Sequence, residues 1–357
     1  MSILIKITDK IVETPSTSSF RFEAIEGEFK YQEGQFITLE IPIGKSIYKR
    51  SYSLSSCNLD DFTQFTVKRV EDGLVSNFLM DKVDIGSIFK ILPPQGSFTL
   101  PKETQYYHYG FIAAGSGITP IFSIIRSLLE TQPLCTVYLL YSVNSPEETI
   151  FFDKISSLVN EYRGQFYLDI ALTKGNTSGN SFLGSFLKKG DPQFQKYVFA
   201  SKRINFDTLK QWIEYREISI KESEFYICGP EGLMDQGLSF LKMEGIPDEN
   251  THFEYFNTTV SDIDENAEKS QVTVIFEGQT IETSLERNVN VLDKMLDLGY
   301  DMPYSCKNGA CSTCIAKLLS GEVKMKVSHG LDPDEINQGY ILTCQALIIS
   351  EKAVIEY

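Results

Sequence analysis

The chain has 357 residues, of which 42% are hydrophobic and 23% charged, a composition typical of a folded protein with two or three domains. Aspartate and glutamate outnumber lysine and arginine by 48 to 33, so the net charge is −15. A surface this acidic repels phosphate backbones, and we expect no nucleic-acid partner. The same acidity suits docking on a basic protein surface, or solubility alone.

The sequence has no apolar run of about 18 residues, so we expect no membrane-spanning segment. The N-terminal stretch MSILIKITDKIVET lacks the apolar core and cleavage site of a signal peptide. These features predict a cytoplasmic protein. Seven cysteines in such a chain indicate metal or thiol chemistry rather than structural disulfides.

Residues 1–103 are predicted to form a small antiparallel β-barrel. Short runs such as 35–41 and 62–70 are rich in Phe, Ile, Thr and Val, and Gly and Pro separate them. One helix is expected at about 75–82. Closely spaced strands with a single helix are typical of a barrel.

Residues 104–256 are predicted to form an α/β domain. Strands alternating with helices predict a parallel sheet that is covered on both faces. The pattern between 175 and 207 is poor, and we expect loop or irregular structure there. Strands are expected at 107–114, 134–141, 166–172 and 224–228, and helices at 119–130, 149–161 and 232–244.

Residues 257–270 are polar and acidic, and we interpret them as a linker. A third domain follows at 271–357. Its expected elements are a hairpin around Gly278 and a helix at 291–298 that Gly299 ends. A cysteine-containing loop and two further strands come after the helix.

Four cysteines of this third domain have a diagnostic spacing. Cys306, Cys311 and Cys314 lie in the run CKNGACSTC, and Cys344 follows in LTCQA. This C-x4-C-x2-C spacing with a distant fourth cysteine is typical of plant-type [2Fe–2S] centres. Two irons need two thiolates each; a tight loop can supply three of them, and a distant strand supplies the fourth.

Small neighbours support the cluster. Gly309, Ala310, Ser312 and Thr313 allow backbone N–H groups to approach the sulfurs. The alternative is a structural zinc site, but zinc favours closely spaced cysteine pairs, and Cys306 and Cys311 are too far apart for one. Residues 271–357 resemble the plant-type ferredoxin fold, an α+β β-grasp domain. The resemblance implies a one-electron carrier of low potential.

A flavin site is indicated in the barrel by the run Arg50-Ser51-Tyr52-Ser53 and by Gly73-Leu74-Val75-Ser76 at the start of the expected helix. A helix N-terminus offers free N–H groups to a pyrophosphate, and Arg50 adds a positive charge. R-x-Y-S alone is a weak signal, and Tyr52 could be ordinary strand filler. Together the runs resemble the FAD motifs of the ferredoxin-NADP⁺ reductase superfamily. That resemblance implies that Tyr52 lies against the isoalloxazine, that Ser53 bonds near N5, and that Gly73 and Ser76 contact the pyrophosphate.

A nicotinamide-nucleotide site is indicated by the run FIAAGSGITP. Gly115 and Gly117 allow a phosphate to approach the backbone, and Thr119 and Pro120 begin a helix. Pro120 stands where a Rossmann motif has its third glycine. The next strand ends at Asn144 without the acidic residue that binds ribose in Rossmann dehydrogenases.

The G-x-G-x-T-P run and the triplet Cys228-Gly229-Pro230 resemble the same superfamily. The resemblance implies that Cys228 sits beside the nicotinamide, although a buried packing cysteine is the alternative. Glu254 and Phe256, in the run FEYF, match an E-x-F pattern that places its aromatic residue near the flavin. We therefore expect Ser53, Cys228, Glu254 and Phe256 to be the catalytic group.

The end of the third strand of the α/β domain bears on the choice of nucleotide. It reads Leu172-Thr173-Lys174-Gly175, and NADPH-using relatives carry a hydroxyl and a cation there to hold the 2′-phosphate. Thr173 and Lys174 supply both, and Lys202 and Arg203 could add charge. We expect NADPH to be preferred over NADH, with modest discrimination because a lone lysine is a flexible point charge.

The order barrel, nucleotide domain, ferredoxin resembles the reductase components of bacterial multicomponent oxygenases, including those of phenylacetyl-CoA ring epoxidases. The runs LPPQGSF, AAGSGITP, CKNGACSTC and LTCQA carry this resemblance, and the chain departs from it at about 178–200. The resemblance implies that electrons pass from NAD(P)H through FAD and the cluster to an oxygenase. FAD must stand between the other two because it alone handles both hydride and single electrons. A general electron-transfer reductase, serving a ferredoxin, flavodoxin or desaturase-type acceptor, and a pure binding module remain as alternatives.

Overall fold

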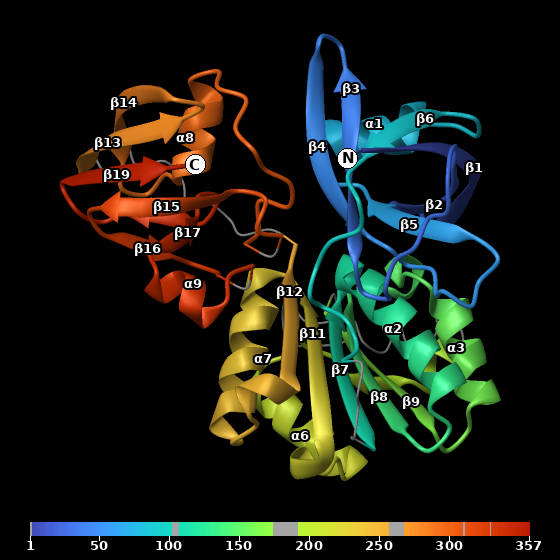
Figure 1. The fold of residues 1–357 in the computed structure, drawn as a ribbon. Helices are drawn as coiled ribbons and strands as arrows, with labels where there is room; N and C mark the ends of the chain where they lie inside the picture. Colours follow the sequence, from blue (N-terminus) through green and yellow to red (C-terminus); the bar gives the residue numbers. More distant parts are fainter. Residues whose placement is uncertain (1, 102–106, 174–191, 257–267, 310, 329) are drawn as a thin grey trace. The chain divides into compact units, whose positions relative to one another are not determined.

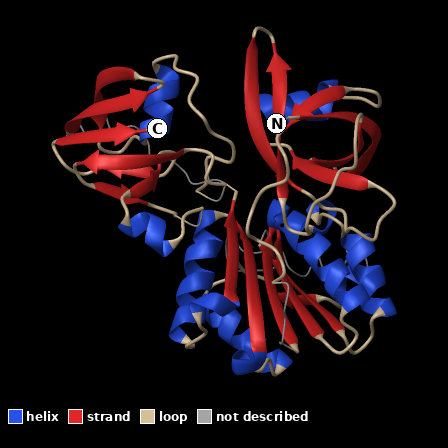
Figure 2. Ribbon diagram, viewed as in Figure 1, coloured by secondary structure: helices blue, strands red, loops and turns tan. Residues whose placement is uncertain are grey.

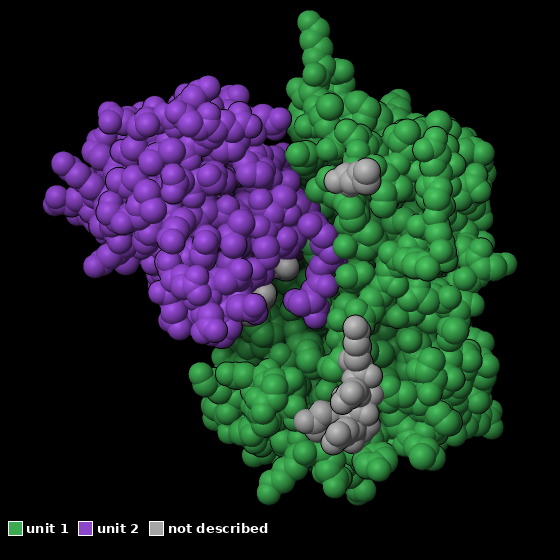
Figure 3. Space-filling view, in the orientation of Figure 1, with its two compact units in different colours: residues 1–94, 98–256 green, residues 95–97, 257–357 purple. Residues whose placement is uncertain are grey.

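The computed structural model divides the chain into two compact units, residues 1–94 with 98–256 and residues 95–97 with 257–357 (Figure 3). No helix in the described part of the chain is long and apolar enough to cross a membrane. The described residues are 2–101, 107–173, 192–256, 268–309, 311–328 and 330–357.

The N-terminal part of unit 1 is the antiparallel barrel that the sequence predicts (Figure 1). Its strand order is β4-β3-β6-β1-β2-β5, and a bridge between Leu54 and Phe65 joins the end of β4 to β5 and closes the sheet. Apolar side chains fill the interior. The elements are β1 (Ile3–Thr14), β2 (Thr17–Ala24), β3 (Phe36–Ile43), β4 (Ser46–Ser53), β5 (Thr63–Lys68), α1 (Leu74–Lys82) and β6 (Ile88–Ile91).

The second part of unit 1 is a parallel sheet with strand order β10-β9-β8-β7-β11-β12. Helices α2 and α3 pack on one face and α6 and α7 on the other, each pair over its own apolar core (Figure 2). The predicted doubly covered sheet is confirmed. The strands are β7 (His108–Ala114), β8 (Thr136–Val143), β9 (Phe166–Leu172), β10 (Val198–Ala200), β11 (Ser223–Gly229) and β12 (Thr251–Tyr255). The helices are α2 (Ile118–Thr131), α3 (Phe152–Glu161), α5 (Pro192–Gln195), α6 (Phe206–Arg216) and α7 (Glu231–Met243).

The structure adds regular elements to the stretch between 175 and 207, where the sequence pattern is poor. Residues 174–191 lie outside the described part. After them, β10 pairs with β9 and extends the sheet, and the side chain of Asn205 caps α6 by accepting a hydrogen bond from the N–H of Thr208 at 3.0 Å. A strand of three residues is too short to show an alternating pattern, so this edge could not be predicted.

A buried carboxylate joins α6 to the sheet. Asp169 on β9 is 3% exposed, and it accepts a hydrogen bond from Trp212 Nε1 at 2.9 Å and two from the guanidinium of Arg216 at 2.7 Å. The bidentate contact satisfies both carboxylate oxygens, which is the condition under which a buried charge is tolerated.

Unit 2 contains a five-stranded mixed sheet, order β14-β13-β19-β15-β17, and the pair β16-β18. Glu277 and Gly278 both have positive φ angles, 50° and 75°, as a tight hairpin turn requires. Strand β13 begins earlier than expected because Lys269 pairs with Glu286 and forms an ion pair with it at 3.0 Å. The elements are β13 (Lys269–Phe276), β14 (Gln279–Glu286), α8 (Val291–Asp297), β15 (Ile315–Ser320), β16 (Val323–Met325), α9 (Pro333–Asn337), β17 (Tyr340–Leu342), β18 (Ala346–Ile348) and β19 (Lys352–Glu356).

Candidate functional site

Three residues of the expected catalytic group meet where the barrel joins the parallel sheet. Ser53 ends β4, and its hydroxyl donates a hydrogen bond to Glu254 Oε2 at 3.4 Å. Glu254 on β12 lies opposite Cys228 on β11 in the strand pairing. Their exposed fractions are 4%, 4% and 0%. Residues that are distant in sequence therefore form one buried polar cluster.

Burial sets the charge of this cluster. It raises the pKa of Glu254 to about 8, although the hydrogen bond from Ser53 acts in the opposite direction. Burial also raises the pKa of the Cys228 thiol, and the neighbouring Glu254 adds to that effect. Both side chains are therefore protonated at neutral pH. A carboxyl that titrates near the working pH can exchange a proton with a bound cofactor.

The fourth member, Phe256, follows β12 directly. It is half-buried and packs against the apolar core shared by α2, α3 and the sheet. This placement keeps its ring at the end of the strand that carries Glu254. The expected contact with a flavin stays a prediction.

The glycine turn between β7 and α2 packs against the same cluster. A Cβ on Gly117 would lie 2.1 Å from the carbonyl oxygen of Cys228, so no side chain fits there. From the sequence, we expect glycine at position 117 because a phosphate must approach the backbone there. In the structure, glycine is also needed because β11 packs closely against this position. Gly229, the residue after Cys228, is less restricted, since a Cβ there would lie 2.8 Å from the flexible Cδ2 of Leu233 and 3.1 Å from the Cβ of Ala114.

The same turn leads directly into the N-terminus of α2. Gly115 has a φ of +53°, and the Gly117 position that precedes α2 carries no capping side chain. Thr119 and Pro120 are buried in the first turn of α2, and the Thr119 hydroxyl donates to the carbonyl of Ser116 at 2.9 Å. The N–H of Ile118 donates to the carbonyl oxygens of Gly115 and Ser116, and Pro120 has no N–H. The expected contact of this turn with a phosphate therefore stays a prediction.

Lys68 is a site residue that the sequence did not reveal. It ends barrel strand β5, and its Nζ lies 3.7 Å from the point that a Cβ of Gly115 would occupy. An ammonium group therefore reaches the glycine turn of the other half of unit 1. Its place at a strand end was visible in the sequence, but the distant turn beside it was not.

The expected flavin residues are divided between the barrel surface and the start of α1. Ser76 is buried; its hydroxyl accepts from the N–H of Val70 at 3.1 Å and donates to the carbonyl of Gly73 at 3.3 Å. Tyr52 is half-buried, and its ring centre lies 5.7 Å from that of Phe65. Arg50 is exposed and donates to the carbonyl of Lys49. Contacts of these residues with a flavin stay predictions.

At the end of β9, the Thr173 hydroxyl donates to Asn144 Oδ1 at 2.8 Å. Lys174 lies outside the described residues. Lys202 and Arg203 are exposed and follow β10, which is the neighbour of β9 in the sheet. Lys202 and Arg203 therefore lie just after the carboxyl end of β10. Pro230 is the residue directly before α7.

The four cysteines of unit 2 form two pairs. The N–H of Cys306 donates to Cys311 Sγ at 3.4 Å, and the N–H of Asn308 donates to Cys306 Sγ at 3.4 Å. Cys314 and Cys344 are 3% and 4% exposed, and a hydrogen bond from Cys344 lowers the pKa of Cys314. Within the described residues, no three His, Cys, Asp or Glu side chains converge as ligands of a single ion. Two thiol pairs fit a two-iron cluster, with two thiolates for each iron.

Backbone conformation shapes the cysteine loop. Lys307, Gly309 and Ser312 have φ angles of 57°, 78° and 55°, which is rare for side chains other than glycine. A Cβ on Gly309 would meet the carbonyl oxygen of Val327 at 2.9 Å. The backbone N–H groups that donate to sulfur in this loop are those of Cys306 and Asn308. Approach of the small residues to the sulfurs stays a prediction.

Comparisons with known proteins match this division. The model of an oxidoreductase FAD-binding domain matches residues 4–100, that of an oxidoreductase NAD-binding domain residues 111–237, and that of a 2Fe-2S iron-sulfur cluster binding domain residues 274–348. The ferredoxin reductase component of 3-ketosteroid-9-alpha-monooxygenase from Rhodococcus rhodochrous is 32% identical over 372 residues, which cover 100% of this chain and 97% of the relative. The chain belongs to the family of FAD- and [2Fe–2S]-containing oxygenase reductases.

Other members of the family support this assignment. One subunit of the 1,2-phenylacetyl-CoA epoxidase from Escherichia coli (strain K12) is 29% identical over 341 residues, 94% of this chain and 91% of that one. The structure of phthalate dioxygenase reductase, described as modular for electron transfer from pyridine nucleotides to [2Fe-2S], shares the fold with a TM-score of 0.63 at 24% identity over 100% and 98% of the two chains. The expected fold class, the cofactor classes and the oxidoreductase activity of this reductase are confirmed.

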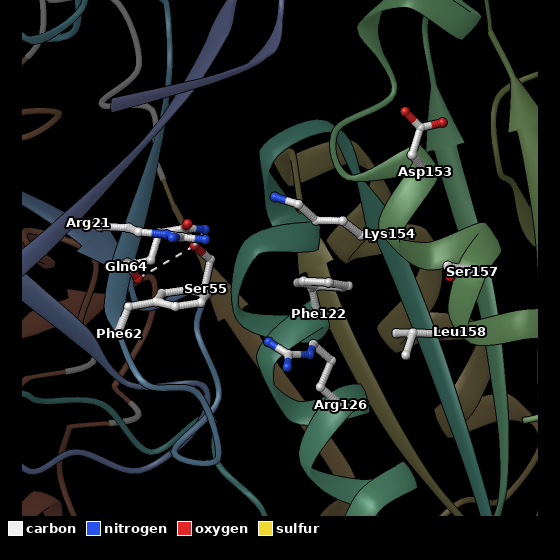
Figure 4. Close-up of a pocket in the computed structure, with 10 residues that line it drawn as sticks. All are labelled: Arg21, Ser55, Phe62, Gln64, Phe122, Arg126, Asp153, Lys154, Ser157 and Leu158. Atoms are coloured by element: carbon white, nitrogen blue, oxygen red, sulfur yellow. Dashed lines mark hydrogen bonds between the residues drawn. The ribbon is translucent and has the colours of Figure 1, made fainter. Parts of the chain in front are cut away.

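A separate cavity of about 450 Å³ lies in unit 1 between the barrel and helices α2 and α3 (Figure 4). None of the described residues that line it belongs to the expected cofactor sites. Of its cations, Arg126 forms a bidentate ion pair with Asp60 at 2.6 and 2.7 Å, and Lys154 pairs with Glu13 at 2.6 Å. The ion pairs tie the two halves of unit 1 together, and the cavity is the gap that they leave.

Proposed function

We propose that this reductase takes electrons from NADPH and delivers them to an oxygenase component that hydroxylates or epoxidises an organic substrate. The main support is the buried cluster of Ser53, Cys228 and Glu254 beside the glycine turn. The same chain also holds two thiol pairs. Relatives that match almost the whole chain are reductase parts of monooxygenase and epoxidase systems. The net charge of −15 suits a basic docking surface on the partner.

Bound FAD would accept hydride and release single electrons, and the cluster would carry them singly. The residues of the chain supply placement and protons. Glu254 would hold a proton at neutral pH and exchange it with the flavin ring through Ser53, to which it is already hydrogen-bonded. Cys228 and Phe256 would exclude water from the nicotinamide and flavin faces. Arg50, Tyr52, Gly73 and Ser76 would hold the flavin.

The nucleotide would bind across the turn before α2. Gly115, the first turn of α2 and the ammonium of Lys68 would contact its pyrophosphate. The turn itself would be shaped by Thr119, Pro120, Gly117, Gly229 and Pro230. Thr173 and Lys174, with Lys202 and Arg203, would contact the 2′-phosphate and favour NADPH. Cys306 with Cys311, and Cys314 with Cys344, would each hold one iron.

We place this activity in the cytoplasm, where reduced nicotinamide nucleotide is available and thiols stay reduced. All seven cysteines lie in the described part of the chain, and no disulfide joins any two of them, which agrees with such a compartment.

Reconstitution tests the proposal. The purified holoprotein is mixed with the oxygenase component encoded beside it, and substrate-dependent NADPH oxidation and product are measured together. The proposal expects product in proportion to NADPH consumed. Equally fast reduction of a soluble ferredoxin or flavodoxin, with no product from the oxygenase, would instead establish a general electron-transfer reductase.

A further inference from the structure

A chain of hydroxyl groups in unit 2 leads to the buried pair of cysteines. The phenol of Tyr357 donates a hydrogen bond to Thr343 Oγ1 at 2.6 Å. The Thr343 hydroxyl in turn donates to the carbonyl oxygen of Cys314 at 3.0 Å. Thr343 also directly precedes Cys344 in the chain. One hydrogen-bonded path therefore connects Tyr357 to the segments that carry both cysteines.

Thr343 is held from every side. It is fully buried, its N–H donates to the Cys314 carbonyl at 3.1 Å, and its carbonyl accepts from the N–H of Leu292 in α8 at 3.1 Å. The Cys314 carbonyl thus receives two hydrogen bonds from one residue. Because backbone and side chain of Thr343 are both fixed, the spacing between Cys314 and Cys344 is fixed with them.

The Tyr357 ring does not depend on its hydroxyl for its position. The ring packs edge-on against Phe276 with centres 5.7 Å apart, and the N–H of Tyr357 donates to the carbonyl of Ile275 at 3.0 Å. Burial raises the pKa of the phenol, so the hydroxyl remains a donor over the whole working range of pH. Removing the hydroxyl alone should therefore leave the ring in place.

We propose that Tyr357 is a positioning residue for electron transfer, which acts through Thr343 on the ligand pair Cys314 and Cys344. The hydrogen of each hydroxyl points along the path toward the Cys314 carbonyl, so the positive ends of both O–H dipoles face the segment that carries Cys314. Such donors favour the more negative, reduced state of an iron–sulfur centre. The inference rests on the ligand set of the proposed function. A tyrosine that merely fills the core would have no such effect through its hydroxyl.

Tyr357→Phe in the holoprotein tests this role. The reduction potential of the cluster is measured by redox titration followed by electron paramagnetic resonance. We expect a more negative potential, equivalent to a roughly three- to tenfold smaller reduced-to-oxidised ratio at a fixed ambient potential, or about 30–60 mV for one electron. Release of iron to a chelator should accelerate in parallel.

Tyr340→Phe is the matched control, because Tyr340 lies in the same unit beside Lys317 and off the Thr343 path. Thr343→Val should reproduce the shift with the Tyr357 ring intact, and Thr343→Ser should restore the wild-type potential. The double variant Tyr357→Phe with Thr343→Val should shift no further than either single variant, because both act through one path.

Two failures are distinguishable. A wild-type protein that binds no iron and acid-labile sulfide at these cysteines overturns the ligand set, and with it the proposed function. A wild-type protein with a full cluster, in which Tyr357→Phe and Thr343→Val match Tyr340→Phe in potential and iron release, overturns only the role of Tyr357.

Discussion

The cysteine site of unit 2 and the Ser53 site of unit 1 gather their residues over different lengths of chain. Three of the four cysteines lie in one loop between Cys306 and Cys314, bent by residues with positive φ. Ser53 and Glu254 are 201 residues apart and meet only because the barrel joins the parallel sheet. The loop sets the spacing of three ligands by its own backbone, whereas the Ser53 site depends on one tertiary junction.

The pKa shifts of the ionisable side chains also differ between the two sites. A hydrogen bond from Cys306 lowers the pKa of Cys311 to about 5, and one from Cys344 lowers that of Cys314 while the pKa of Cys344 itself is raised. Burial raises the pKa of Glu254 and Cys228, which favours neutral groups suited to proton exchange. Because the two groups of residues belong to different units, variants in one should spare the other.

The largest expected effect is that of Cys344→Ser. It should remove nearly all iron and acid-labile sulfide while FAD content and flavin reduction by NADPH stay unchanged, because the ligand lies in unit 2. Electron delivery to cytochrome c should collapse. Metal analysis measures the loss of the cluster, and stopped-flow reduction measures the flavin reaction. Cys135→Ser is the control. A full complement of iron in Cys344→Ser would show that the ligand assignment is wrong.

Gly117→Ala tests the close packing between the turn before α2 and strand β11 in unit 1. The added Cβ would lie 2.1 Å from the Cys228 carbonyl, and overpacking of this kind costs about 1–3 kcal/mol of unfolding free energy. Flavin reduction should slow while cluster content stays normal. Gly232→Ala, in α7 with open space around the added Cβ, is the matched control and should be neutral or stabilising by up to about 1 kcal/mol. Denaturant unfolding compares them; equal stability would contradict the packing argument.

Glu254→Gln tests whether the Ser53 site makes the unfolding free energy depend on pH. The folded pKa of about 8 lies above the ordinary value of 4.5, so the folded protein keeps a proton that the unfolded chain has lost. The resulting stability is fully present below pH 4.5 and is lost as pH rises through 8, with a total of a few kcal/mol. Glu254→Gln should flatten this fall in flavin-free protein.

The same variant should remove any inflection near pH 8 from the rate of flavin reduction. Glu249→Gln, which changes an exposed carboxyl nearby, should leave both pH profiles as in the wild type. A wild-type unfolding free energy that does not change between pH 5 and 8 would show that Glu254 is ionised throughout.

The smallest expected effect concerns the nucleotide. Lys174→Ala and Arg203→Ala should each lower kcat/KM for NADPH by roughly three- to fivefold, the loss typical of an exposed charge contact, and leave NADH unchanged. Lys210→Ala, on the exposed side of α6, is the control. A clear preference for NADH that Lys174→Ala does not alter would contradict the proposed NADPH selectivity.

Much of the fold could be predicted because its signals are local. Alternation of strands and helices indicated the parallel sheet, and the cysteine spacing depends on one loop and one later strand. Lys68 could not be found in this way, because its partner turn at Gly115 is distant in sequence. Strand β10 was missed because three residues show no periodicity.

The sequence by itself determined which chemistry the chain carries, because phosphate-binding turns and cluster loops need particular residues at short spacings. Only the tertiary structure decided how Glu254 is charged, why Gly117 has no side chain, and that Tyr357 is bonded to Thr343. The physical reason is that burial and hydrogen bonding depend on which distant segments pack together. A carboxyl, a glycine and a tyrosine have the same formula in any sequence, and their pKa, steric limits and partners come from those neighbours.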